Sequence, residues 1–231
     1  MNIYGYQKTT LLDYPGLVAA TIFTGGCNFG CPFCHNSELI TCSSLSSPVT
    51  EDEIFSFLQK RKNVLSGVCI TGGEPTLQPK LFDFIKKIRS FGYKIKLDTN
   101  GYLPEVLSAL LKDHLLDYIA MDIKSGISGY PAISGIPHLQ IEKIRTSISI
   151  IENSGINYEF RTTVVKELHN PQDFYEIRDM LSSKSPYFIQ SFQDSGNILV
   201  PGLSSCDKKT LSEYLSIVQE KLIYAKLRGI D

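Results

Sequence analysis

The clearest chemical signal in the sequence lies in the segment 25–36, where Cys27, Cys31 and Cys34 fall within eight residues and glycines lie close by. Thiolates spaced this closely on a loop can point at one centre, and three of them suit a soft metal ion or an iron–sulfur cluster. Structural zinc sites and ordinary 4Fe–4S clusters take four protein ligands, and no fourth cysteine follows at a matching spacing. Three ligands would leave one cluster iron open, and an open coordination position predicts that a substrate binds there.

Two plainer interpretations of these cysteines stay open at this point. They could be reduced loop thiols, or three parts of a zinc site that His35 completes. A lone loop histidine such as His35 is more often a surface or hydrogen-bonding group than a metal ligand. Among the other cysteines, Cys69 falls in an apolar stretch typical of the core, and Cys42 and Cys206 are interpreted as bystanders.

The composition excludes several classes of protein. The chain has 231 residues, of which 42% are hydrophobic and 20% charged, so one domain with a substantial core is expected. The formal net charge of −1 argues against a general nucleic-acid or membrane surface. No apolar signal segment opens the chain, and no apolar run is long enough to span a membrane. Cysteines clustered in such a chain predict cytoplasmic, metal-binding thiols and not a disulfide framework.

Strand and helix patterns alternate along the chain. Residues 1–16 are interpreted as a lead-in that contacts the body, 43–48 as a polar connector, and 125–138 as an irregular segment rich in Gly, Pro and Ser. Apolar β-rich runs predict strands at 17–23, 67–71, 94–98, 118–122, 158–165 and 187–192. Helical patterns lie at 50–62, 78–91, 103–113, 139–154, 171–181 and, as a closing helix, 206–227. This alternation predicts βαβ units and a parallel sheet, either an open doubly wound sheet or an incomplete barrel.

Polar groups follow the predicted strands at their carboxyl ends, where ligands bind in such folds. The segment after the second strand is Gly72-Gly73-Glu74-Pro75, the third ends in Asp98 and Thr99, and the fourth in Asp122 and Lys124. Arg161 and Thr163 lie within the fifth strand, and Gln193 follows the sixth. Because these ends share one edge of a parallel sheet, we expect one polar rim.

Each of these groups also has a plain structural explanation. A Gly-Gly pair after a strand is most often a tight turn, the aspartates could cap the next helix or turn, and Lys124 could be a surface charge. The functional interpretation is that the glycines let a ligand approach the backbone. Glu74 would then meet an ammonium group, and Lys124 and Arg161 a substrate carboxylate. Phe33 could shield a cluster or stack on a base.

These motifs resemble a known family. The C-x3-C-x2-C segment after the first strand, with Phe33 before the last cysteine, is similar to the radical S-adenosylmethionine (SAM) superfamily motif. Gly72-Gly73-Glu74-Pro75 resembles that superfamily's methionine-binding segment. A closer likeness, to the glycyl-radical-enzyme activating enzymes, covers about residues 5–193. The best match is the longer form, anaerobic ribonucleoside-triphosphate reductase activating protein. It is carried by Asp13-Tyr14-Pro15-Gly16, Gly26-Cys27-Asn28, Cys34-His35-Asn36, Asp98-Thr99-Asn100-Gly101, Asp122-Ile123-Lys124 and Arg161-Thr162-Thr163-Val164-Val165.

The resemblance implies an incomplete (βα)6 barrel, in one domain over 1–231 with its barrel core at 17–193. Cys27, Cys31 and Cys34 would ligate three irons of a 4Fe–4S cluster, and SAM would chelate the fourth. The resemblance also implies a set of residues that contact SAM, and a monovalent cation near Asp98 and Asp122. The implied SAM contacts are Phe33, Gly72, Gly73, Glu74, Asp98, Thr99, Asp122, Lys124, Arg161, Thr163 and Gln193.

The implied reaction is reductive cleavage of SAM to a 5′-deoxyadenosyl radical, which removes a hydrogen from a glycine of a partner enzyme. The implied partner is an anaerobic ribonucleotide reductase, and the electron donor a flavodoxin or ferredoxin, because the chain lacks an added ferredoxin-like insert. Gln193 departs from the pattern, since a well-studied formate-lyase activase has a histidine there. Two alternatives remain: a small-molecule radical SAM enzyme such as a 7-carboxy-7-deazaguanine synthase, and a non-catalytic iron–sulfur or zinc module.

Overall fold

The computed structural model describes residues 1–42, 48–194 and 196–229, so most of the connector at 43–48 lies outside the described residues. The chain divides into two compact units. The first contains Met1–Asn28, Glu38–Thr99 and Glu105–Ile119; the second contains Phe29–Ser37, Asn100–Pro104 and Ala120–Asp231. β5 (Tyr118–Asp122) is the strand along which the chain passes from the first unit to the second.

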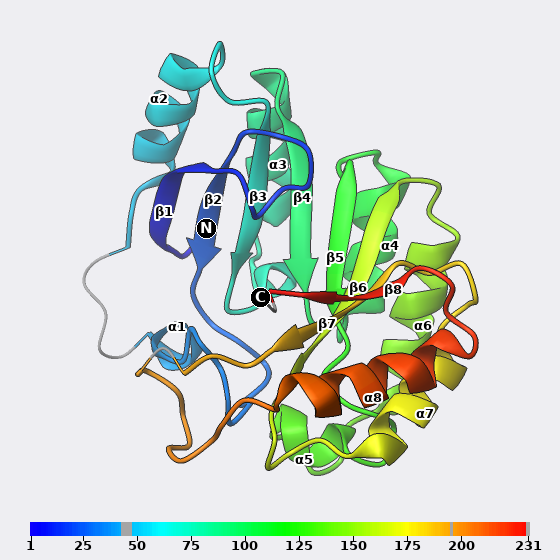
Figure 1. The fold of residues 1–231 in the computed structure, drawn as a ribbon. Helices are drawn as coiled ribbons and strands as arrows, with labels where there is room; N and C mark the ends of the chain where they lie inside the picture. The colour runs from blue at the N-terminus through cyan, green and yellow to red at the C-terminus, as the bar shows by residue number, and fades with distance from the viewer. Residues whose placement is uncertain (43–47, 195, 230–231) are drawn as a thin grey trace. The chain divides into compact units, whose positions relative to one another are not determined.

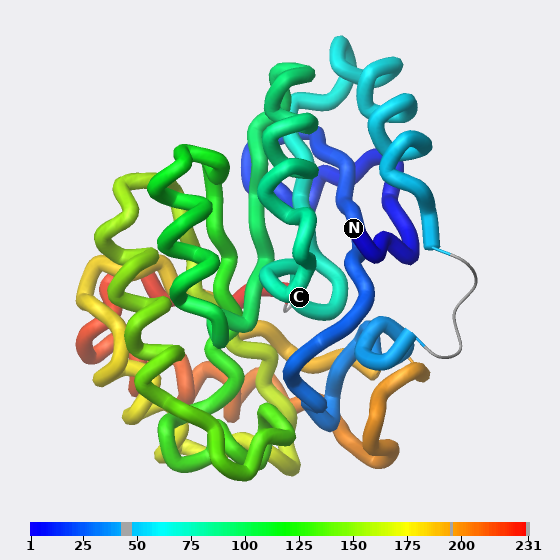
Figure 2. Tube along the Cα trace, turned by 180° about the vertical axis from the view of Figure 1, so that it is seen from behind, coloured from blue at the N-terminus to red at the C-terminus, as the bar shows by residue number. Residues whose placement is uncertain are grey.

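The first unit is built on strands β1 to β4 (Figure 1). β1 (Ile3–Thr10) pairs antiparallel with β2 (Ala19–Thr24), and β2 pairs parallel with β3 (Gly67–Gly72), which pairs parallel with β4 (Lys94–Thr99). Figure 2 shows from behind how α3 (Leu81–Ser90) covers β3 and β4. The unit also contains α1 (Glu38–Thr41), α2 (Glu51–Arg61), the 3-10 helix η1 (Pro75–Leu77) and, except for its first residue, α4 (Pro104–Lys112).

Local sequence explains these helices. Thr50 caps α2, because its hydroxyl accepts the Glu53 backbone N–H at 3.2 Å. α3 buries one apolar face, made of Leu81, Phe84, Ile85 and Ile88, each at most 1% exposed. Burial of one such stripe is what holds an amphipathic helix on a sheet.

The second unit is built on β6 (Asn157–Val164), β7 (Tyr187–Ser191) and β8 (Ala225–Arg228), which pair parallel in that order. Its helices are α5 (Tyr130–Ser134), α6 (Ile141–Glu152), α7 (Pro171–Met180) and α8 (Lys208–Gln219). α7 and α8 lie side by side (Figure 1), and Phe174 stacks on Tyr214 with ring centroids 4.2 Å apart. α7 begins with a capping box between Asn170 and Asp173.

The α/β fold expected from the sequence is confirmed. The eight strands of the sheet follow the order of the chain, with β1 and β8 as its edges, so the sheet is open. The predicted strands correspond to β2 through β7, with bounds that differ by a few residues. No helix in the described ranges has the length and apolar character that a membrane crossing requires.

Three expectations about single segments need correction. The lead-in at 1–16 contains a strand, β1, because its backbone groups pair with β2. The irregular segment at 125–138 contains α5, which ends at Ser134 and is capped by Gly135 with φ +72°, the left-handed conformation that glycine adopts readily. The closing helix ends at Gln219 and not near 227, because the chain turns over 220–224 and then forms β8 along the edge of β7. Tertiary pairing overrides the helical pattern there.

Candidate functional site

The cysteine loop begins directly after β2, as predicted. Cys27 belongs to the first unit, whereas Cys31 and Cys34 belong to the second, where the Cys34 N–H donates to the Cys31 carbonyl at 3.1 Å. None of the six cysteines, all of which lie in the described ranges, forms a disulfide. Within the described ranges, no three His, Cys, Asp or Glu side chains are arranged to hold a single metal ion. The cysteines therefore remain predicted ligands.

The two second-unit thiols have an environment suited to ligation. Cys31 is only 6% exposed, and burial raises the pKa of its thiol while the Lys124 ammonium acts in the opposite direction. Burial also raises the pKa of Cys34, whereas a hydrogen bond from the Asn36 backbone lowers it. Because metal ligands must be thiolates, binding of a cationic cluster would favour the deprotonated form that burial disfavours. This donor set fits an iron–sulfur cluster.

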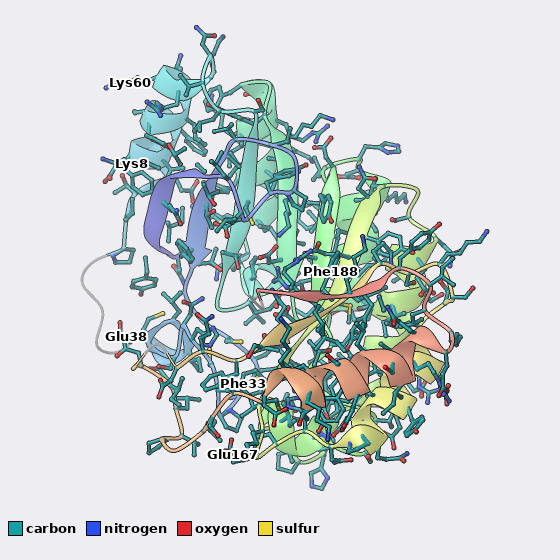
Figure 3. The ribbon with its side chains drawn as sticks, in the orientation of Figure 1. Lys8, Phe33, Glu38, Lys60, Glu167 and Phe188 are labelled. Carbon is teal, nitrogen blue, oxygen red and sulfur yellow. The ribbon has the colours of Figure 1, made fainter. Side chains whose placement is uncertain are left out.

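A buried histidine that the sequence did not single out supports this loop. Phe33, labelled in Figure 3, is 5% exposed and meets His169 edge to face with ring centroids 6.1 Å apart. The Nδ1 of His169 accepts the Val165 N–H at 3.0 Å, so its Nε2 carries the proton and donates to the Lys124 carbonyl at 2.9 Å. His169 follows Val164, the last residue of β6, by five residues, and no motif in the sequence predicted this role.

The segment at 125–138 also supports the loop. The Gly30 N–H donates at 2.8 Å to the carbonyl of Ser134, which is the last residue of α5. A Cβ on Gly135 would lie 3.0 Å from the Gly30 carbonyl oxygen. The backbone of the cysteine loop therefore contacts the end of α5 closely, and glycines on both sides make room for it.

In the first unit, the Gly-Gly pair after β3 lies against the start of the cysteine loop. Gly72 has φ +120°, and a Cβ on Gly73 would lie 2.1 Å from the Gly26 carbonyl oxygen. The Gly73 N–H donates to the Thr24 carbonyl at 2.8 Å, and the Glu74 N–H donates to the Gly26 carbonyl at 2.8 Å. Gly73 is therefore required by backbone contact with Gly26, the residue that precedes Cys27, and Gly72 by its positive φ and by contact with the Thr24 backbone. This is more than a simple tight turn requires.

Glu74 is held rigidly in this unit. It is 1% exposed, and its Oε1 accepts the Thr76 N–H at 3.1 Å, the Thr76 hydroxyl at 2.5 Å and the Thr99 hydroxyl at 2.8 Å. Hydrogen bonds of this kind stabilise a buried carboxylate. The structure thus brings together two predicted residues, Glu74 and Thr99, through Thr76, whose role the sequence alone did not indicate.

Asp98 sits beside a buried lysine. Lys96, two residues earlier on β4, forms an ion pair with the Asp98 Oδ1, and its side chain is 1% exposed. The Lys96 Nζ lies 3.8 Å from the Cys69 Sγ and 5.9 Å from the Tyr118 ring centroid. Lys96 was not predicted as a site residue, although alternation along a strand places it on the same side as Asp98.

Asp122, Lys124 and Arg161 meet in the second unit, as predicted. The Lys124 Nζ donates to Asp122 Oδ2 at 2.9 Å, and the Arg161 Nε donates to Asp122 Oδ1 at 2.6 Å. Burial favours the neutral acid, but Arg161 and Lys124 outweigh it and hold the pKa of Asp122 far below its usual range. Burial likewise opposes the charge on Lys124, and Asp122 with Cys31 raises the lysine pKa above its usual value. All three groups are charged at neutral pH.

The charges continue beyond the predicted residues. Glu159, 2% exposed, lies 3.9 Å from the Arg161 Nη1 and accepts two hydrogen bonds from Arg228, at 2.9 and 2.7 Å. The Arg228 guanidinium lies 3.6 Å from the ring centroid of Phe188, which is labelled in Figure 3. Neither Glu159 nor Arg228 was predicted. Glu159 lies on the predicted strand at 158–165 without a motif of its own, and Arg228 ends β8, most of which falls within the predicted closing helix.

Two predicted residues lie apart from these contacts. Thr163 on β6 is half-buried and pairs with Gln190 of β7. Gln193 is exposed and follows β7 by two residues. Their contacts to SAM stay predictions.

Comparisons with known proteins follow the same direction. Residues 21–181 match the model of the radical SAM superfamily. The protein MJ1227 of Methanocaldococcus jannaschii, whose name assigns it provisionally to the glycyl-radical enzyme activating enzymes, is 31% identical over 195 residues, covering 83% of this chain and 80% of the relative. The pyruvate formate-lyase-activating enzyme of Clostridium pasteurianum is 27% identical over 178 residues, covering 74% of this chain and 72% of the relative.

A further relative carries the name of a synthase and not of an activating enzyme. The 7-carboxy-7-deazaguanine synthase of Thermococcus kodakarensis is 27% identical over 185 residues, covering 71% of this chain and 70% of the relative. Among solved structures, SuiB of Streptococcus suis bound to S-adenosylmethionine has a TM-score of 0.64 at 16% identity, covering 88% of this chain and 48% of that chain. This likeness supports the incomplete barrel fold. The chain therefore belongs to the radical SAM superfamily and, within it, to the family of the glycyl-radical enzyme activating enzymes.

Proposed function

We propose that this protein cleaves SAM reductively at a 4Fe–4S cluster and generates a glycyl radical on a partner enzyme. One observation supports the first part best. The Gly-Gly-Glu segment is joined to the cysteine loop by the Glu74 N–H, which donates to the Gly26 carbonyl at 2.8 Å, one residue before Cys27. A substrate held by that segment would lie beside the first cluster ligand.

In this proposal Cys27, Cys31 and Cys34 hold the cluster, and the substrate takes the open iron. When bound, the cluster supplies the electron that breaks the S–C5′ bond of SAM and gives a 5′-deoxyadenosyl radical. The residues of the chain contribute position and exclude side reactions. Gly72 and Gly73, packed on the backbone of Thr24 and Gly26, would contact the methionine part through their own backbone groups, and Phe33 would shield the loop.

The remaining side chains would recognise the charged parts of SAM. Lys124 and Arg161 place two cations around one carboxylate, Asp122, so this group has a surplus positive charge that suits the substrate carboxylate. Glu74, held by its hydroxyl donors, would receive the substrate ammonium. Contacts to the methionine or ribose are assigned in the proposal to Asp98, Thr99, Thr163 and Gln193.

The partner in the proposal is an anaerobic ribonucleoside-triphosphate reductase, whose glycine Cα loses a hydrogen atom to the 5′-deoxyadenosyl radical. The electron donor is a flavodoxin or ferredoxin, and the site of action is the cytoplasm. The relatives named as glycyl-radical enzyme and pyruvate formate-lyase activating enzymes support the reaction type. The choice of reductase follows from the resemblance of the motifs.

The test is anaerobic reconstitution with iron and sulfide, reduction, and addition of SAM. We expect release of 5′-deoxyadenosine, and none from a Cys31→Ala variant treated alike. Addition of an anaerobic ribonucleotide reductase should then give a glycyl radical doublet in electron paramagnetic resonance. Release of 5′-deoxyadenosine without a radical on any glycyl radical enzyme would reject the second part of the proposal and keep the first.

The second candidate function is a radical SAM reaction on a small molecule. The identity to a 7-carboxy-7-deazaguanine synthase favours it, but at 27% over 71% of the chain, against 31% over 83% for MJ1227. It would be supported if a low-molecular-weight cell fraction, and not a partner enzyme, accelerated 5′-deoxyadenosine release.

A further inference from the structure

The resemblance to activating enzymes implies a monovalent cation near Asp98 and Asp122. Such a site needs carboxylate oxygens that a bound cation can approach. In this structure each carboxylate already has a cationic side chain of the protein. Asp98 pairs with Lys96, and Asp122 pairs with both Lys124 and Arg161. The donor groups of this chain therefore do not fit a free monovalent cation well.

The pair in the first unit is the more unusual one. Lys96 and Asp98 lie two residues apart on β4, so their side chains leave the strand on the same side. Lys96 is 1% exposed and the Asp98 side chain is 13% exposed, whereas Lys94, on the same strand, is exposed. A lysine this deeply buried is costly unless its charge is paired. Its place in the sheet thus depends on the Asp98 carboxylate.

The surroundings keep the ammonium beside that carboxylate. The Cys69 Sγ lies 3.8 Å from the Lys96 Nζ and 3.6 Å from the Asp98 Oδ1. The Tyr118 ring, with its centroid 5.9 Å from the Nζ, adds a favourable cation–π contact. The ion pair is neutral in sum, and a further cation at Asp98 would be repelled by Lys96 at short range in a poorly solvated place.

We infer that the Lys96 ammonium supplies at Asp98 the positive charge that other activating enzymes would take from a bound monovalent cation. Lys96 is then a positioning residue, which keeps the Asp98 carboxylate ionised and oriented for SAM. This inference rests on the proposed function for the role of Asp98. The pairing itself does not depend on which partner enzyme is activated.

The first experiment measures SAM affinity of the reconstituted full-length protein by anaerobic equilibrium dialysis, in potassium, sodium or tetramethylammonium chloride at equal ionic strength. Tetramethylammonium is too large to replace a coordinated metal ion. For the wild type we expect affinities within about twofold across the three salts. Lys96→Met, which keeps an unbranched side chain, should bind SAM about tenfold more weakly in tetramethylammonium and recover in potassium or sodium.

Two variants control for general damage. Lys94→Met changes an exposed lysine on the same strand and should behave like the wild type in every salt. Lys96→Arg keeps the charge and should remain independent of the salt. A wild type that loses about tenfold in affinity without potassium and sodium would overturn the inference, as would Lys96→Met with wild-type affinity in tetramethylammonium.

A second measurement does not use SAM. Thallous ion, a monovalent probe, is titrated into each protein and followed by thallium NMR, together with the thermal unfolding midpoint in the three salts. We expect a bound thallium signal and a higher midpoint in potassium only for Lys96→Met. Thallium bound equally by wild type and Lys96→Met would overturn the inference. Because this readout needs no turnover, it decides the role of Lys96 even if no glycyl radical can be produced.

Discussion

In the first unit Glu74 is held by two threonine hydroxyls and a backbone N–H, whereas in the second unit Asp122 is held by the cations of Lys124 and Arg161. The hydroxyl and N–H groups that hold Glu74 are uncharged, and two of them belong to Thr76, only two residues away. The second arrangement is a chain of alternating charges that continues through Glu159 to Arg228. Hydroxyl donors set geometry, while paired charges set geometry and also a local excess of positive charge.

This difference teaches which changes each unit tolerates. A hydroxyl can be removed at the cost of one hydrogen bond. Removing one member of a buried charge chain leaves its neighbours uncompensated, and that costs more. We therefore expect larger effects from charge changes in the second unit than from hydroxyl changes in the first.

Replacing Cys31 by alanine should abolish the cluster and all SAM cleavage. Cys31 is buried in the second unit beside Lys124, so no exposed side chain can substitute for its thiolate. Iron content, visible absorbance and 5′-deoxyadenosine release measure the result. Cys206→Ala, which changes another buried cysteine outside the loop, serves as the control and should keep the cluster and SAM cleavage. SAM cleavage retained by Cys31→Ala would remove it from the ligand set.

Replacing Asp122 by asparagine should weaken SAM binding by about tenfold or more and leave the cluster intact. The change leaves Lys124 and Arg161 close together without the carboxylate that holds both. Equilibrium dialysis gives the affinity, and iron content reports the cluster. Asp194→Asn, an exposed change in the same unit, is the control. An unchanged affinity would exclude Asp122 from the site.

The same variant has a defined pH signature. The pKa of Asp122 is lowered in the folded state, so its pairing stabilises the fold fully above the unfolded-state pKa of about 3.9. That contribution is lost as the pH falls below this value toward the lower folded pKa. Urea unfolding should therefore show a constant difference between wild type and Asp122→Asn near neutral pH, which shrinks below about pH 4. A difference that grows on acidification would contradict the assigned pairing.

Replacing Arg228 by methionine should raise the KM for SAM several-fold with a smaller effect on kcat. Arg228 is linked to Arg161 through Glu159, so we expect it to act by orienting Arg161. Arg228→Lys keeps the charge and should recover part of the KM. Steady-state 5′-deoxyadenosine kinetics separate the two constants. A fall in kcat as large as the rise in KM, seen in both variants, would indicate general destabilisation and not orientation of Arg161.

The sequence predicted which polar side chains lie at the strand ends, because their position follows from parallel strands whose carboxyl ends meet at one edge. Asp122, Lys124 and Arg161 do meet within the second unit, and Glu74 meets Thr99 within the first. What it did not predict were the supporting groups. Lys96 lies two residues before Asp98, and Glu159 lies two residues before Arg161. A charged side chain at such a position on a strand is usually at the surface.

Other misses have a tertiary cause. Arg228 could not be found, because β8 forms only by pairing with β7 at residues whose local pattern continues a helix. His169 lies just before α7, and its role depends on carbonyl and amide groups of Lys124 and Val165 that no local motif reveals. Both cases show that supporting residues depend on contacts far apart in sequence.

The smallest effect is expected from Thr76→Val, which keeps the shape of the side chain and removes one hydroxyl donor to the buried Glu74 carboxylate. The Thr99 hydroxyl and the Thr76 N–H remain, so we expect a loss of about 1.5–3 kcal/mol in the free energy of unfolding, the range for hydrogen bonds to charged groups. Urea unfolding measures it. Thr146→Val, an exposed threonine on α6, should change stability by less than about 0.5 kcal/mol. If Thr76→Val also matched the wild type, the hydroxyls would not be what holds Glu74, and the contrast between a hydroxyl-held Glu74 and a charge-held Asp122 would fail.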